Sequence, residues 1–279
     1  LQDLLDAFGA VLIEGPKWCG KTTTASQLAN SILRMQDPSM REEYLATAKT
    51  KPSILLKGNT PRLIDEWQDA PMLWDAIRTT VDDRQIPGQF ILTGSNAVDK
   101  SQIHHSGAGR IARLRMLPMS LWESQESTGE VSLKELFNNP DYDIDGKMSK
   151  MTVEDLIFAA SRGGWPASLL ARTPKAQLLV AKNYVQTICS DDISGIDGRK
   201  RDAKLTSMIL RAYARNVSTL VKKKSLLDDV TSSGEVSCHV DTFDDYVAAL
   251  EKLFVIHNIS AWCPAIRSKI GRASCRERV

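Results

Sequence analysis

Short apolar runs alternate with helical patterns in the first part of the chain. Ala10–Glu14, Arg62–Ile64 and Gln89–Thr93 are brief and mostly apolar, and each stops at a glycine or at acidic residues. Such runs are typical of parallel strands that are covered on both faces. Lys21–Met35 and Met72–Val81 repeat apolar residues three and four positions apart, which predicts helices. The alternation predicts a parallel α/β sheet with helices on both faces.

The pattern changes after Leu117. Glu123–Lys150 is polar and rich in Asn, Asp, Gly and Ser, which indicates an exposed loop or insertion. Helical patterns follow, and a strand pattern comes last: Thr152–Ser161, Pro174–Ser190, Leu205–Val221, Lys224–Thr231 and Phe243–Leu253, then the strand Phe254–Ile259. We therefore expect a core at 1–135, a helical lid or linker at 136–204, and a further domain at 205–269.

Composition adds few constraints. The chain has 279 residues, 42% of them apolar and 25% charged, which is ordinary for a globular protein, and its net charge of +2 favours no class of partner. No apolar run approaches the roughly 18 to 20 residues of a membrane span, so we expect no membrane partner. The five cysteines form no CxxC pair, which argues against a disulfide framework or zinc site. A reducing cytoplasm is the expected location.

The strongest motif follows the first strand. The segment has the pattern GxxxxGK[ST] between a strand and a helix, the context in which this pattern forms a phosphate-binding loop. Glycines let the backbone N–H groups wrap closely around phosphates. We expect Lys21 to bridge the β- and γ-phosphates of ATP and the Thr22 hydroxyl to bind Mg²⁺. The predicted nucleotide-binding residues are Gly15, Pro16, Lys17, Trp18, Cys19, Gly20, Lys21, Thr22 and Thr23.

Polar residues end the next two predicted strands. Asp65 and Glu66 follow one strand, and a carboxylate at this point can hold the magnesium while the next acts as general base. An acidic pair in a surface turn would look the same. The third strand ends in a polar segment in which Ser95 and Asn96 could sense the γ-phosphate or orient water. A plain turn is again the alternative.

Three arginines alternate in the segment GRIARLRM. Alternation places Arg113 and Arg115 on one side of a strand and Arg110 on the other. One of them could act as an arginine finger, in cis or from a neighbouring subunit. A solvated basic edge strand explains the pattern equally well.

Taken together, these segments resemble a known family. GPKWCGKTTTA, LIDEWQDAP, FILTGSNA, GAGRIARLRMLPMSLWE and GGWP are similar to bacterial and archaeal AAA+ ATPases of the AAA_14 type, which usually carry a C-terminal DUF4143 region. The resemblance implies a P-loop core of AAA+ type, a winged-helix region and a nuclease-like C-terminal domain. By position, it assigns Lys21 and Thr22 to Walker A, Asp65 and Glu66 to Walker B, Ser95 and Asn96 to sensor 1, and Arg110 to the family's GR segment.

The winged-helix expectation for 205–269 leaves the partner open. Lys222, Lys223 and Lys224 could contact a phosphate backbone. The expected recognition helix, however, carries Asp241 and Asp244, and such an acidic helix is unfavourable in a DNA groove. DNA, a protein partner or a purely structural role all remain open, as does homo-oligomerisation.

Two hypotheses follow for function. The first is an ATPase that hydrolyses ATP with Mg²⁺ and moves its C-terminal part or a bound partner. The alternative is a switch that binds nucleotide without hydrolysis and thereby gates DNA or protein binding. Glu66, which directly follows Asp65, favours the enzyme.

The last ten residues are unlike the rest. Residues 270–279 resemble the translation of a common short-read sequencing adapter, so we expect a non-native tail on a gene fragment. Without this tail, the chain has 33 basic and 33 acidic residues, and its formal charge is zero.

Overall fold

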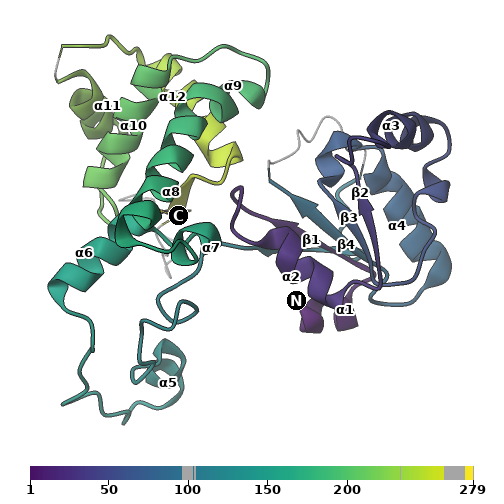
Figure 1. Cartoon of the computed structure of the whole chain (residues 1–279), viewed down its shortest axis with the longest axis horizontal. Coiled ribbons are helices and arrows are strands. Elements are labelled where there is room, and N and C mark those ends of the chain that lie inside the picture. Colours follow the sequence, from purple (N-terminus) through teal and green to yellow (C-terminus); the bar gives the residue numbers. More distant parts are fainter. Residues whose placement is uncertain (96–102, 104, 233, 261–273, 279) are drawn as a thin grey trace, which may run out of the picture. The chain divides into compact units, whose positions relative to one another are not determined.

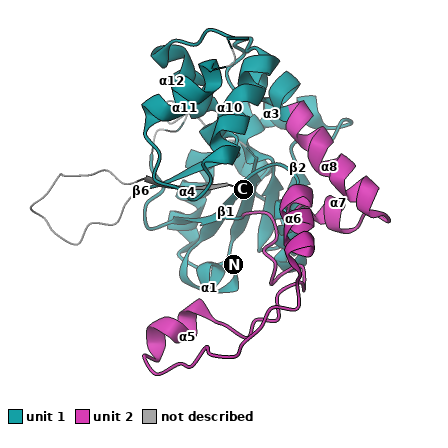
Figure 2. Ribbon diagram, turned by 90° about the vertical axis from the view of Figure 1, so that its left-hand side faces the viewer, with its two compact units in different colours: residues 1–116, 188–279 teal, residues 117–187 magenta. Residues whose placement is uncertain are grey.

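The computed structural model describes residues 1–95, 103, 105–232, 234–260 and 274–278, and the side chains of these residues up to 259. They form two compact units, which are coloured separately in Figure 2. One combines Leu1–Met116 with Ile188–Val279, and the other is Leu117–Thr187. The division that we expected, at 135 and 204, stays a proposal.

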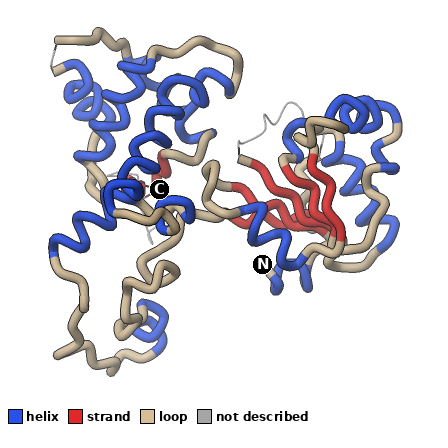
Figure 3. The backbone as a smooth tube through the Cα atoms, viewed as in Figure 1, coloured by secondary structure: helices blue, strands red, loops and turns tan. Residues whose placement is uncertain are grey.

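The first unit contains a five-stranded parallel sheet (Figure 3). Its strands are β1 (Ala10–Glu14), β2 (Ser31–Arg34), β3 (Arg62–Asp65), β4 (Phe90–Gly94) and β5 (Ile111–Arg115). They lie in the order β2-β3-β4-β1-β5, and every neighbouring pair is parallel. The predicted parallel α/β fold is therefore confirmed.

Helices cover both faces of this sheet (Figure 1). Successive side chains of β1 point to opposite faces, so Val11 and Ile13 join one apolar cluster while Ala10 and Leu12 join another. The first cluster includes residues of α1 (Gln2–Ala7) and α2 (Lys21–Leu28), and the second includes residues of α3 (Arg41–Thr50) and α4 (Leu73–Arg84). Burial of both faces explains why β1 and β4 are almost entirely apolar.

One predicted helix was wrong in its second half. We expected a single helix over Lys21–Met35, but α2 ends at Leu28 and Ser31–Arg34 forms β2. The N–H of Asn30 donates to the carbonyl of Pro61 at 2.8 Å, which starts the pairing of β2 with β3. In so short a segment, apolar periodicity does not separate a strand from a helical turn, and pairing with β3 decides.

The rest of the first unit is mainly helical, as the sequence predicted. Its elements are the π-helix Ile188–Asp192, α9 (Ile193–Gly195), α10 (Ala203–Arg215), α11 (Lys223–Thr231), α12 (Val240–Lys252), and the antiparallel strands β6 (Ile256–Ser260) and β7 (Ser274–Arg278). The apolar sides of the helices are buried, including Ile209, Leu226 and Leu250. Assignment of these elements to a winged helix stays a proposal.

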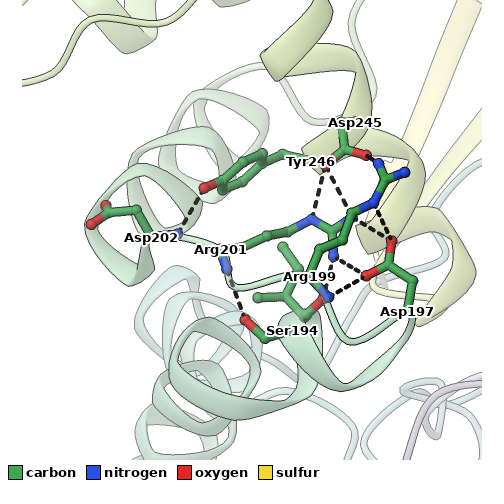
Figure 4. Close-up of polar contacts among 8 residues, drawn as sticks. Ser194, Asp197, Arg199, Arg201, Asp202, Asp245 and Tyr246 are labelled. Atoms are coloured by element: carbon green, nitrogen blue, oxygen red, sulfur yellow. Dashed lines mark hydrogen bonds and ion pairs between the residues drawn. The ribbon is translucent and has the colours of Figure 1, made fainter.

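A buried arginine ties the segment before α10 to α12 (Figure 4). The guanidinium of Arg201 donates two hydrogen bonds of 2.8 Å to the carboxylate of Asp197 and one of 3.0 Å to Asp245. It also donates to the carbonyl of Ile193 at 2.8 Å. The Arg201 side chain is only 3% exposed, whereas Arg199, beside the same two aspartates, is 72% exposed. The hydrogen bonds from Arg201 lower the pKa of Asp197 to about 2.

The second unit holds α5 (Leu133–Asn138), α6 (Val153–Arg162), α7 (Pro166–Leu169) and α8 (Pro174–Thr187). Helix α6 begins with a capping box, in which the Thr152 hydroxyl accepts from the N–H of Asp155 and the Asp155 carboxylate accepts from the N–H of Thr152. Arg162 and Glu126 form a bidentate ion pair at 3.0 and 2.7 Å.

In the part of the chain that the structure describes, no helix has both the length and the apolar character needed to cross a membrane.

Candidate nucleotide-binding site

Three sequence motifs meet at one edge of the sheet. β1 lies beside β4, and β4 lies beside β3, so the carboxyl ends of these parallel strands are neighbours. Glu14, the last residue of β1, is level with Gly94. Asp65 follows the paired residues Ile64 and Leu92, so it is level with Thr93. The phosphate loop, the acidic pair and the polar end of β4 therefore converge.

The loop from Gly15 to Thr22 depends on its two glycines. A Cβ atom on Gly15 would lie 2.0 Å from the carbonyl oxygen of Met116, so no larger residue fits there. Gly20 caps α2 in a left-handed conformation, with φ of 101°, that other residues rarely adopt. The loop thus leads into the N-terminus of α2, where unpaired N–H groups favour bound anions.

Lys21 lies inside this loop. Its side chain is buried, and its Nζ donates to the carbonyl oxygens of Gly15 at 3.0 Å and Pro16 at 2.7 Å. Burial lowers the pKa of Lys21, while the nearby acidic groups, Glu66 and Asp65 among them, act in the opposite direction. An ammonium that donates to two loop carbonyls is well placed to exchange them for phosphate oxygens.

Two hydroxyl groups converge on Asp65. The Thr22 hydroxyl donates to Asp65 Oδ1 at 2.7 Å, and the Thr93 hydroxyl donates to the same oxygen at 2.6 Å. Carboxylate and hydroxyl oxygens are ligands that Mg²⁺ accepts, and it commonly takes one or two from the protein and the rest from phosphates and water. The side chains of Thr22 and Asp65 therefore fit a magnesium ion bound together with a nucleotide.

Glu66 is held in an uncommon backbone conformation. Its φ and ψ are 56° and 49°, in the left-handed region, and its N–H donates to the Thr93 hydroxyl at 3.3 Å. Its Oε2 accepts hydrogen bonds from the Ser95 hydroxyl at 3.1 Å and from the Gln68 amide. Non-glycine residues in this region are uncommon and cluster at functional sites.

The structure thus adds two residues to the site that sequence reasoning did not assign. Thr93 connects Asp65 with Glu66, and Gln68 contacts the Glu66 carboxylate. Both lie in the motifs LTGS and LIDEWQ, but only the fold shows which side chains of each motif turn inward. Asn96, the other expected sensor residue, lies outside the described residues.

Trp18 and Cys19 occupy the tip of the loop. The Trp18 side chain is exposed, and its backbone has a φ of 63°. Cys19 is buried, with its Sγ 3.7 Å from the carbonyl oxygen of Met116. Burial raises the pKa of the Cys19 thiol, which keeps it protonated and suits packing beneath the loop rather than reactivity.

Arg110 does not lie at this edge. It precedes Ile111, which pairs with Ala10 at the amino end of β1, and its Nε lies 2.8 Å from Asp82 Oδ1. A five-residue strand rises about 16 Å, which places Arg110 at the opposite edge from the loop of its own chain. The idea that Arg110 acts in cis is therefore not supported. Arg113 is closer to the loop, with its Nη1 3.2 Å from Glu14 Oε2.

Family comparisons agree with this geometry. Residues 7–125 match the AAA_14 family, an AAA domain. Residues 153–274 match DUF8612, a domain of unknown function, whereas the DUF4143 region expected from the resemblance is not shown.

The chain is also similar to two curated proteins and to a solved structure. The chain is 24% identical over 271 residues to the uncharacterized proteins Mb2031c of Mycobacterium bovis and Rv2008c of Mycobacterium tuberculosis. The match covers 94% of this chain and 52% of each relative, so the chain spans about half their length. The Walker-type ATPase PABY2304 of Pyrococcus abyssi superposes with a TM-score of 0.54 at 13% identity, covering 92% of this chain and 88% of that one. Residues 7–125 are thus similar to an AAA domain, and the superposition agrees with a P-loop NTPase fold.

Proposed function

We propose that the chain binds ATP together with Mg²⁺ and hydrolyses it. The observation that carries this proposal is the hydrogen-bonded series of Thr22, Asp65, Thr93 and Glu66, which lies at the same sheet edge as Lys21. A phosphate loop alone would serve binding. An ordered second carboxylate next to the expected metal ligand is what hydrolysis requires in addition.

The residues divide the work as follows. The loop Gly15–Thr22, with Thr23 beyond it, surrounds the phosphates and offers them its available backbone N–H groups. Lys21 exchanges its loop carbonyls for β- and γ-phosphate oxygens. Thr22 and Asp65 would hold the magnesium, which would neutralise charge on the phosphates. Glu66 accepts a proton from the attacking water. Ser95 and Asn96 belong to the expected sensor segment at the end of β4.

Two substitutions test this assignment. Lys21→Ala removes the buried ammonium, and we expect it to abolish Mg²⁺-dependent ATP turnover. Glu66→Gln keeps the shape of the side chain but not its basicity, so turnover should slow strongly while ATP binding survives. Phosphate release measures the first quantity and calorimetry the second. Lys49→Ala, an exposed lysine on α3, is the matched control. Robust turnover in both site variants would contradict the proposal.

One ion pair favours coupling between nucleotide and the C-terminal helices. Lys17, within the loop, places its Nζ 2.6 Å from Asp192 Oδ1 at the end of the π-helix Ile188–Asp192. A triphosphate in the loop would compete with Asp192 for the Lys17 ammonium. This supports a coupling of nucleotide binding to the helical region. Both hypotheses need such a coupling: the ATPase that moves a bound partner, and the alternative, a switch that binds ATP without hydrolysis.

The partner of that helical region is proposed more broadly, as DNA or protein. Two of the acids on α12 already face basic groups, since Asp244 contacts Lys223 and Asp245 accepts from Arg201. Fluorescence anisotropy of a labelled DNA duplex at physiological salt, with and without ATP, tests the DNA version. Unchanged anisotropy would count against it and favour a protein partner.

The position of Arg110 bears on assembly. Because it lies at the sheet edge opposite its own phosphate loop, Arg110 can serve as an arginine finger only for a second copy of the chain. The proposed role of Arg110 as an arginine finger therefore requires that the chain forms homo-oligomers.

A further inference from the structure

Gln68 lies on a short 3-10 helix, Trp67–Asp69, that directly follows Glu66. This helix is anchored to the core, because Trp67 is buried and its ring lies 5.0 Å from that of Trp74 in α4. The N–H of Asp69 donates to the carbonyl of Glu66 at 3.1 Å, which closes the turn. The backbone that carries Gln68 is therefore fixed relative to Glu66.

The Gln68 side chain contacts the Glu66 carboxylate. Its Nε2 donates to Glu66 Oε2, the same oxygen that accepts from the Ser95 hydroxyl. Two donors on one oxygen fix the plane of the carboxylate. Because both act on Oε2, we assign Oε1 as the oxygen that takes a proton from water.

The carbonyl oxygen of the Gln68 amide, Oε1, lies in a crowded position. It is buried and has no hydrogen-bond partner among the described residues. A Cβ atom on Gly94 would lie 3.1 Å from this oxygen and 3.1 Å from Trp67 Nε1. Leaving a buried carbonyl unpaired costs free energy, which the hydrogen bond from Nε2 to the Glu66 carboxylate has to offset.

We infer that Gln68 is a positioning residue, which orients the Glu66 carboxylate for its reaction with water. This inference rests on the proposed ATP hydrolysis. Gln68 donates to the carboxylate without carrying charge, so it holds the group without pairing away its negative charge. A side chain at position 94 would crowd this amide, so Gly94 leaves it the space that it occupies.

Gln68→Met is the decisive variant because it keeps the size of the side chain and removes the donor. We expect kcat to fall about 10-fold to 100-fold, the range of a hydrogen bond to a charged group, while KM for ATP stays within about twofold. In a Glu66→Gln background, measured in single turnovers, the same change should cause no further loss. Gln85→Met, exposed at the other edge of the sheet, is the matched control.

A binding measurement needs no turnover. ADP with Mg²⁺ and aluminium fluoride mimics the phosphoryl group in transfer, and calorimetry gives its affinity. Gln68→Met should weaken this complex by a factor similar to the loss in kcat, while the affinity for ADP with Mg²⁺ alone stays unchanged.

Three results would overturn the inference. They are a wild-type kcat in Gln68→Met, an equal loss in the Glu66→Gln background, and a parallel loss of ADP affinity and thermal stability, which would indicate a structural role. If the wild-type chain itself shows no Mg²⁺-dependent turnover, the proposed function fails first. Turnover that is normal in the wild type and in Gln68→Met refutes only the role of Gln68.

Discussion

Arg201→Met is expected to loosen the helices of the C-terminal part of the first unit. Arg201 is almost fully buried, and its guanidinium is the shared partner of Asp197 and Asp245 (Figure 4). Methionine fills a similar volume without charge or donors. The substitution therefore leaves two carboxylates without their principal cation, while the packing around them changes little.

The size of the effect follows from burial. Removing one partner of a fully buried ion pair costs about 3–5 kcal/mol, because the charge left behind is uncompensated. Here Asp197 and Asp245 are 30% and 38% exposed, so water can partly solvate them. We therefore expect a loss of about 2–3 kcal/mol. Arg199→Met removes a cation from the same two aspartates, but Arg199 is exposed, and its loss should cost about 0.5 kcal/mol or less.

Amide hydrogen exchange on peptides from α10 and α12 measures this loss locally, which avoids assuming that the whole chain unfolds in one step. Arg201→Met should reduce protection there by roughly 30-fold to 150-fold. Arg199→Met should leave protection within about threefold of the wild type. Equal effects of the two substitutions would refute the reasoning. The expected difference rests on the burial of Arg201 and not on the number of ion pairs that each arginine forms.

Two more predictions concern stability. Because its pKa is lowered to about 2 in the folded chain from an ordinary 3.8, Asp197 should contribute stability that is fully present above about pH 4 and lost as the pH falls towards 2. The difference in protection between wild type and Arg201→Met should shrink over that interval, and a difference that grows would contradict the sign. Thr152→Ala should cost about 1 kcal/mol, since it removes the hydroxyl of the capping box of α6. Hydrogen exchange in α6 measures this loss, and unchanged protection would show that the cap contributes little.

Apolar patterns predicted the sheet well, for a physical reason. The strands are covered on both faces, so β1, β3 and β4 are short apolar runs that end abruptly at glycine or acidic residues. The sequence did not predict β2, because β2 is an outer strand of the sheet and carries charge, with Arg34 exposed and Leu33 buried. Its sequence continues the helical spacing of α2, and only its pairing with β3 distinguishes the two.

The candidate site was predictable down to its motifs, but not to all of its contacts. Lys21, Thr22 and Asp65 could be chosen because phosphate and magnesium require particular groups at particular strand ends. The bridging role of Thr93 depends on its being level with Asp65 on the neighbouring strand. No spacing within one segment contains this information, since it arises from the register between two strands.

The arginines of β5 show the same limit more sharply. Each residue along a strand points its side chain to the opposite face and lies about 3.3 Å further on. Arg110 and Arg115 therefore point to opposite faces of the sheet and lie at opposite ends of β5. The register with β1 places Arg115 beside Glu14, next to the phosphate loop, and Arg110 beyond the first pair of the strand. Sequence similarity marks Arg110 by its motif alone. The position of Arg110 implies that any role of this residue in hydrolysis depends on contact between two copies of the chain. Arg113 and Arg115, by contrast, form ion pairs with Glu14 of the same chain.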